Sequence, residues 1–260
     1  MSDEQANPVT VAVLGLGEAG GTIARDLVEA GAVVRGYDPA VTAGDGIIDT
    51  ASEAEAATGA DLVLSVNSSK ASIGALRAGA GAVGDGIWAD LNTASPGTKK
   101  QLAGIAREHG VPFADIAIMA PVPGRGLRTP LLISGVAADD VARILGALGA
   151  SVTVMDGEAG LAAERKLLRS VFFKGLAAAV VEALEAGRAA GCEDWLRDNI
   201  AEELTRADAS TVDRLVRGTH QHAVRRADEM TAATEMLVEL AVEPTMAAAT
   251  RDFLIRLTKS

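Results

Sequence analysis

The first 156 residues alternate short apolar, β-branched runs with longer alanine-rich runs whose apolar residues repeat with helical spacing. Short apolar runs bounded by glycine, proline or aspartate are typical of buried strands, and the longer runs predict helices. Strands are predicted at 9–14, 33–37, 62–66, 87–90, 113–119, 131–134 and 152–155. This alternation predicts an α/β fold, a doubly wound and mostly parallel sheet with helices on both faces.

The pattern changes near Asp156, where the strand signals stop and helical spacing continues to the end of the chain. Helices are predicted at 157–187, 193–205, 208–217, 220–242 and 245–258. The first of them is unusually long for a globular protein. We therefore predict two domains, an α/β domain over 1–156 and an all-helical domain over 157–260.

Charge and composition narrow the classes of partner. The formal net charge is -11, which disfavours binding to nucleic acid or to an anionic membrane surface. The single cysteine, Cys192, excludes an internal disulfide and fits a cytoplasmic protein. The three histidines lack metal-ligand spacing, so no metal site is expected.

A glycine motif marks the end of the first predicted strand. The sequence GLGEAG at 15–20 is G-x-G-x-x-G between a strand and a helix, the context that dinucleotide binding requires. The first glycine permits a tight turn, the second lets the backbone approach a pyrophosphate, and the third lets helix and strand pack closely. The N–H groups at the helix start would then hold phosphate. The pattern predicts a Rossmann domain.

Asp38 ends the second predicted strand and is placed to accept hydrogen bonds from the adenosine ribose. Its charge would repel a 2′-phosphate, and the residues at 39–42 include no lysine or arginine to receive one. We therefore expect NAD in preference to NADP. The alternative interpretation is a glycine turn that binds no ligand, followed by a turn-forming Asp-Pro pair.

Four segments in order resemble the β-hydroxyacid dehydrogenase superfamily, which includes 6-phosphogluconate dehydrogenase and 3-hydroxyisobutyrate dehydrogenase. They are GLGEAG at 15–20, DLNTASP at 90–96, APVPG at 120–124 and GLAAERKLLRS at 160–170. The resemblance implies that Lys166 is the catalytic lysine and that Thr93 lies beside the nicotinamide. The cofactor-binding candidates are Gly15, Leu16, Gly17, Glu18, Ala19, Gly20, Asp38, Val66, Asn67 and Thr93.

The same resemblance implies a substrate site. Its candidate residues are Asn92, Pro123, Gly124, Arg125 and Ser170. The chain departs from the family pattern at Asn92 and Pro123, where the family has serine, at Ala162, where it has glycine, and at Ser170, where it has asparagine. Because three of these departures fall where the family touches substrate, the class of reaction is implied more firmly than the substrate.

Lys166 suits the chemistry of such a reaction. Hydride transfer at a hydroxyl-bearing carbon needs a proton to leave or join the oxygen, and a partly desolvated amine can carry it. Most isolated lysines are instead solvated surface charges. Arg125 and Arg128 flank the 120–124 loop and would clamp a substrate carboxylate, or equally remain loop-surface charges.

Three functions remain open. The first is an NAD-dependent dehydrogenase acting on a small, carboxylate-bearing hydroxy acid or its keto form. The segment 115–121 also resembles imine reductases, although these usually lack a lysine at the position of Lys166. The third is a non-catalytic dinucleotide-binding protein. In each case we expect a homodimer through the helical domain, because the helix at 157–187 is apolar on several sides.

Overall fold

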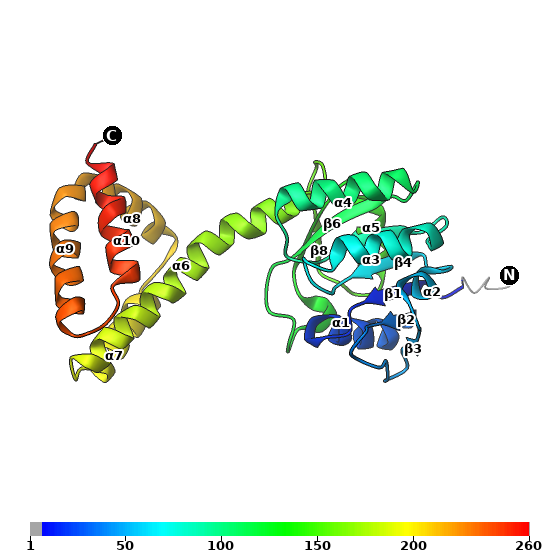
Figure 1. Ribbon diagram of the computed structural model, residues 1–260, viewed down its shortest axis with the longest axis horizontal. Helices are drawn as coiled ribbons and strands as arrows, with labels where there is room; N and C mark the ends of the chain where they lie inside the picture. The colour runs from blue at the N-terminus through cyan, green and yellow to red at the C-terminus, as the bar shows by residue number, and fades with distance from the viewer. Residues whose placement is uncertain (1–6, 260) are drawn as a thin grey trace. The chain divides into compact units, whose positions relative to one another are not determined.

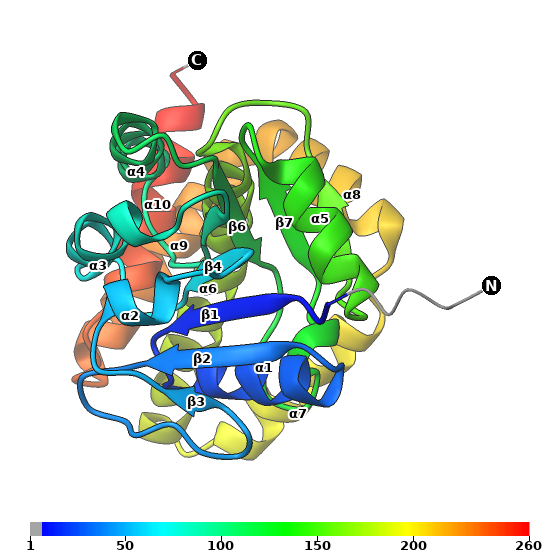
Figure 2. The ribbon, with the colours of Figure 1, turned by 90° about the vertical axis from the view of Figure 1, so that its right-hand side faces the viewer.

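The apolar runs of the first half form one eight-stranded sheet in the computed structural model, which describes residues 7–259 (Figure 2). The strand order is β3-β2-β1-β4-β5-β6-β7-β8, and neighbouring strands are parallel except for β6 and β7. The strands are β1 (Thr10–Leu14), β2 (Val33–Tyr37), β3 (Ile48–Asp49), β4 (Leu62–Ser65), β5 (Ile87–Asp90), β6 (Phe113–Ile118), β7 (Leu131–Ser134) and β8 (Val152–Val154). The predicted α/β class is confirmed, and β3 is a strand that the sequence pattern did not predict.

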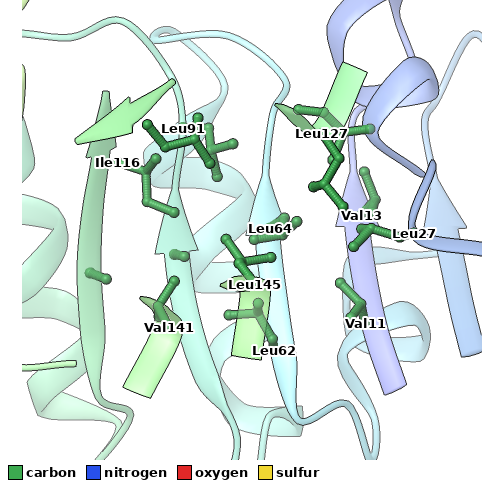
Figure 3. Close-up of a cluster of buried hydrophobic side chains, with 14 of the residues drawn as sticks. Val11, Val13, Leu27, Leu62, Leu64, Leu91, Ile116, Leu127, Val141 and Leu145 are labelled. Carbon is green, nitrogen blue, oxygen red and sulfur yellow. The ribbon is translucent and has the colours of Figure 1, made fainter. Parts of the chain in front are cut away.

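Helices cover both faces of this sheet, so its central strands are apolar on both sides. Val11 and Val13 of β1 point to one face and belong to the same buried cluster as Leu27, Val141 and Leu145 (Figure 3). The intervening residues of β1 pack on the other face. The helices of the first face are α1 (Glu18–Glu29) and α5 (Ala138–Ala147), and those of the second are α2 (Glu53–Ala57), α3 (Ser72–Gly79) and α4 (Pro96–Glu108).

The second half is all helical, as predicted (Figure 1). It contains α6 (Leu161–Ala189), α7 (Glu193–Thr205), α8 (Ala209–Gln221), α9 (Ala223–Glu239) and α10 (Thr245–Leu257). The helix predicted from 157 begins four residues later, because Gly160 has a φ of +104°, which a helix does not allow. The helix predicted at 220–242 begins at Ala223, and α8 continues through His220.

The chain forms two compact units, of which the first ends at Arg169 and the second begins at Ser170. The predicted boundary at Asp156 marks the end of the strands, whereas the first two turns of α6 belong to the sheet-containing unit. Ala162 and Ala163 of that segment are buried, and their N–H groups donate to residues of the sheet.

The second unit has a small buried core. Ala186, Leu237 and Ala247 form it, and α9 packs along α10. Glu182 of α6 is also buried and accepts hydrogen bonds from the N–H groups of Met246 (2.6 Å) and Ala247 (2.7 Å), which start α10. Between residues 7 and 259, no helix is both long and apolar enough to cross a membrane.

Candidate functional site

The candidate site lies at one edge of the sheet. Strands β1, β4, β5 and β6 are parallel, so their carboxyl ends lie on the same side. The glycine turn follows β1, Val66 and Asn67 follow β4, Asn92 and Thr93 follow β5, and the loop at 119–130 follows β6. Ligands of open α/β sheets bind outside such carboxyl ends.

The three glycines of the 15–20 turn each have a distinct structural reason. Gly15 has a φ of +100°, and a Cβ on it would lie 2.7 Å from the backbone of Asn67. A Cβ on Gly20 would lie 1.9 Å from the Gly15 carbonyl oxygen, so only glycine lets α1 approach the turn. Gly17 instead faces open space, because a Cβ on it would have no neighbouring atom within 4 Å. The start of α1 is therefore accessible to a phosphate group.

Asp38 is held in a fixed orientation beside this turn. Its Oδ2 accepts a hydrogen bond from the N–H of Leu16 (2.8 Å), and its Oδ1 accepts from the N–H groups of Ala40 (2.8 Å) and Val41 (3.2 Å). A carboxylate oxygen has capacity for more than one donor. The glycine turn and the predicted ribose-binding carboxylate are thus tied together by a direct hydrogen bond.

The segment after β5 carries two predicted site residues in different environments. Asn92 is buried, and its Nδ2 donates to Asp90 Oδ2 (2.7 Å) and Asn67 Oδ1 (2.9 Å). Its amide hydrogens are therefore directed at neighbouring residues of the protein. Thr93 is exposed at the same edge. The sequence predicts that Asn92 binds substrate. In this structure its side chain links the residues at the ends of β4 and β5, immediately before Thr93.

Lys166 lies in the second turn of α6 and is half-buried. It lines a cavity that is too narrow to hold a water molecule, together with Asn92 and Thr93. The other residues around this cavity are Ala94, Ile116, Ala117 and Ala163. Two segments about 70 residues apart in sequence, the DLNTASP and GLAAERK motifs, therefore meet at one cavity. Ser170 follows one helical turn after Lys166, at the start of the second unit.

The loop between β6 and β7 carries the remaining candidates. Pro123, Gly124 and Arg125 are exposed, and so is Arg128. The loop is fastened to α1, because Asp26 Oδ2 accepts a hydrogen bond from the N–H of Leu127 (2.7 Å). The predicted substrate loop is thus anchored on α1, whose start is the predicted phosphate-binding site.

Sequence reasoning missed a group of buried charges below this edge. Lys99 of α4 lies 2.5 Å from Asp90 Oδ1 and 3.0 Å from Asp115 Oδ1, and all three side chains are fully buried. The helical spacing gave a clue that Lys99 is buried. Lys99 precedes the buried Leu102 by three residues and the buried Ala106 by seven, so all three lie on one face of α4. Within the described residues, no cluster of histidine, cysteine and carboxylate side chains is placed to hold a metal ion.

Comparison with known proteins agrees with this geometry. Residues 10–157 match the family described as the NAD binding domain of 6-phosphogluconate dehydrogenase. The chain belongs to this family. Its members bind the nicotinamide cofactor on a Rossmann domain, so the dinucleotide-binding interpretation of the 15–20 turn is supported, although not the choice between NAD and NADP. Residues 188–257 match a second family, a domain of unknown function called DUF1932.

Individual relatives extend the similarity over the helical unit. An uncharacterised 28.5 kDa protein from Methanothermus fervidus is 26% identical over 167 residues, which span 64% of each chain. A solved protein of unknown function, described as structurally similar to 3-hydroxyacid dehydrogenases, is 25% identical with a TM-score of 0.60, over 96% of this chain and 97% of that chain. The imine reductase of Myxococcus stipitatus with NADP+ shares the fold (18% identity, TM-score 0.82, 96% and 94% of the chains).

Proposed function

We propose that this member of the family is an NAD-dependent oxidoreductase of the β-hydroxyacid dehydrogenase type. It would interconvert a small hydroxy acid and its keto form, with Lys166 as the general acid and base. One observation carries the proposal. Lys166 reaches a cavity that Asn92 and Thr93 also line, at the carboxyl edge where the glycine turn lies.

The residues divide the chemistry between them. Bound NAD(H) would accept or supply the hydride. Oxidation of a hydroxyl also releases the proton on its oxygen, and the Lys166 amine would take it up; reduction of the keto form would run the same transfer in reverse. The exposed Thr93 side chain would lie beside the nicotinamide, with Asn92 holding its segment in place.

The neighbourhood of Asp38 favours NAD. A 2′-phosphate would bring its negative charge next to that of the carboxylate. Arg35, the nearest basic residue before Asp38 in the sequence, donates to the Thr58 carbonyl oxygen. It is therefore already hydrogen-bonded rather than available for a 2′-phosphate.

The exposed loop after β6 suits an anionic substrate. Arg125 follows the positive-φ Gly124 and projects from a loop whose far end is fixed to α1. A guanidinium in this position would bind a carboxylate through two parallel hydrogen bonds. We therefore propose a small substrate that carries a carboxylate.

Replacing Lys166 tests the proposal. A panel of 2- and 3-hydroxy acids, keto acids and cyclic imines first identifies a reaction that the wild type catalyses with NAD(H). Lys166→Ala should then lower kcat by about 10²–10⁴-fold, the usual range for a general acid or base. Lys166→Arg should fail equally, because a guanidinium keeps its proton near neutral pH.

The control is Lys174→Ala, which removes an exposed lysine two turns further along α6 and should keep kcat. NADH affinity, followed by fluorescence titration, should change little in all three variants. A Lys166→Ala enzyme that binds NADH and retains more than about a tenth of kcat, with chemistry rate-limiting, would rule out this role.

A second candidate is reduction of a C=N bond. It is favoured by the segment at 115–121 and by the fold shared with an imine reductase. Turnover of cyclic imines without turnover of any hydroxy or keto acid would select it. NADH binding without turnover of any compound in the panel would instead indicate a non-catalytic dinucleotide-binding protein.

A further inference from the structure

The buried charges beneath the site form a connected network. The Lys99 ammonium lies between two carboxylates, and it also donates a 2.8 Å hydrogen bond to the Asp90 carbonyl oxygen. All three side chains are completely shielded from solvent. Two carboxylates face one ammonium, so the group carries an excess of one negative charge that the surrounding protein must balance.

The start of α6 provides this balance. The second carboxylate oxygen of Asp115 accepts hydrogen bonds from the N–H groups of Gly160 and Ala163, each 3.0 Å long. Ser134 Oγ accepts a third from the N–H of Ala162 (3.1 Å). Gly160 immediately precedes α6, and Ala162 and Ala163 belong to its first turn, whose N–H groups have no partner within the helix and carry its partial positive charge. Asp115 therefore fixes where α6 begins, five residues before Lys166.

The other arm of the network leads to the second segment that lines the cavity. Asp90 Oδ1 accepts a hydrogen bond from the N–H of Asn92 (3.2 Å), and its Oδ2 accepts from the Asn92 amide (2.7 Å). Thr93 follows immediately. The network thus joins the segment that carries Asn92 and Thr93 to the helix that carries Lys166, the two segments that meet at the cavity.

A gain in stability alone is a weak explanation for burying these three charged side chains. Burying three charges incurs a large desolvation penalty, and well-packed apolar residues of similar volume are often equally stabilising. We propose that Asp115 is a positioning residue: with Lys99 and Asp90 it fixes the start of α6 against the segment at 92–93 and so holds Lys166 at the cavity. This inference rests on the proposed role of Lys166 in proton transfer.

The test measures the Lys166 amine directly and needs no substrate. Wild type and variants are labelled briefly with acetic anhydride across a range of pH, and mass spectrometry gives the labelling rate of Lys166 relative to the exposed Lys100 in the same sample. Asp115→Ala should change this ratio at least about threefold at one or more pH values, because the helix start loses both its acceptor and its charge. Asp115→Asn should return the ratio toward wild type, since its amide oxygen still accepts.

The matched control is Asp208→Ala, which removes the side chain that caps α8 in the other unit and should leave the ratio unchanged. If Asp115→Ala lowers the melting temperature but leaves the ratio at the wild-type value, the network is structural only and the proposal is wrong. If Asp115→Ala does not fold, Ser134→Ala takes its place under the same criterion. Turnover by Lys166→Ala would disprove the proposed function separately, because labelling does not depend on it.

Discussion

Asp38 shows how a single residue can set cofactor choice. Because three backbone N–H groups already orient its carboxylate, the negative charge stands at a fixed place beside the glycine turn. We predict that the wild type binds NADH at least about tenfold more tightly than NADPH, a difference of about 1.4 kcal/mol. Fluorescence titration of both cofactors measures it.

Asp38→Asn removes the charge and keeps one acceptor oxygen, which can still accept the hydrogen bond from the N–H of Leu16 in the glycine turn. The variant should gain affinity for NADPH while NADH affinity changes less. Asp61→Asn is a control, because Asp61 also accepts a backbone hydrogen bond next to β1, from Thr10, and lies at the amino end of its strand. A wild-type preference for NADPH of tenfold or more would contradict the prediction.

Single residues also show how far a sequence can be interpreted. The glycines and Lys166 were found because each belongs to a spaced motif with a chemical reason for every position. Lys99 was missed because its neighbours in the chain, Thr98, Lys100 and Gln101, are those of a solvated helix surface. Only the fold brings Asp90 and Asp115 to its ammonium. The aspartate within the otherwise apolar strand at 113–118 was the available clue, since a buried charge needs a partner.

At the scale of elements, hydrophobic spacing predicted most segments well. The helix at 193–205 has the predicted bounds, and the five main parallel strands end within one residue of prediction. The errors have physical causes. β3 is only two exposed residues long, too short for an alternating pattern, and α8 and α9 are divided at His222 by a change of backbone direction that no proline or glycine signals.

The junction of α6 and α7 offers a prediction at this scale. Glu193 at the start of α7 binds Arg188 of α6 through two hydrogen bonds, and Arg197 through a third. The Arg188 guanidinium, followed by that of Arg197, lowers the pKa of the Glu193 carboxyl to about 2. NMR titration of the Glu193 carboxyl carbon should therefore show a midpoint well below that of an ordinary glutamate.

The sign of the pH effect follows from this shift. A lowered folded-state pKa stabilises the protein above the ordinary pKa of glutamate, and that contribution is lost as the pH falls through about 2. Arg188→Ala should raise the midpoint more than Arg197→Ala, because Arg188 is the larger cause. A wild-type midpoint above about 4 for Glu193 would contradict the ion pairing described here.

At the scale of the whole molecule, the two units differ in how they bury apolar residues. The sheet-containing unit has two large cores, whereas the helical unit has a core of a few residues and many large apolar side chains on its surface. The exposed ones include Val171, Phe172, Val181, Trp195, Val212, Val216, Val224 and Val238. Exposed apolar surface on this scale is typical of an interface. A second copy of this chain would cover it by the symmetric pairing most common among oligomers.

We therefore predict a homodimer through the helical unit. Light scattering after size exclusion at micromolar concentration should give about twice the 26.5 kDa chain mass. Val171→Asp places a charge on an α6 side chain that is 76% exposed in the single chain, so it should dissociate the dimer without unfolding the protein, as circular dichroism can check. Lys174→Glu, one turn further along α6, controls for the added charge. A wild type that is monomeric at this concentration would contradict the predicted homodimer.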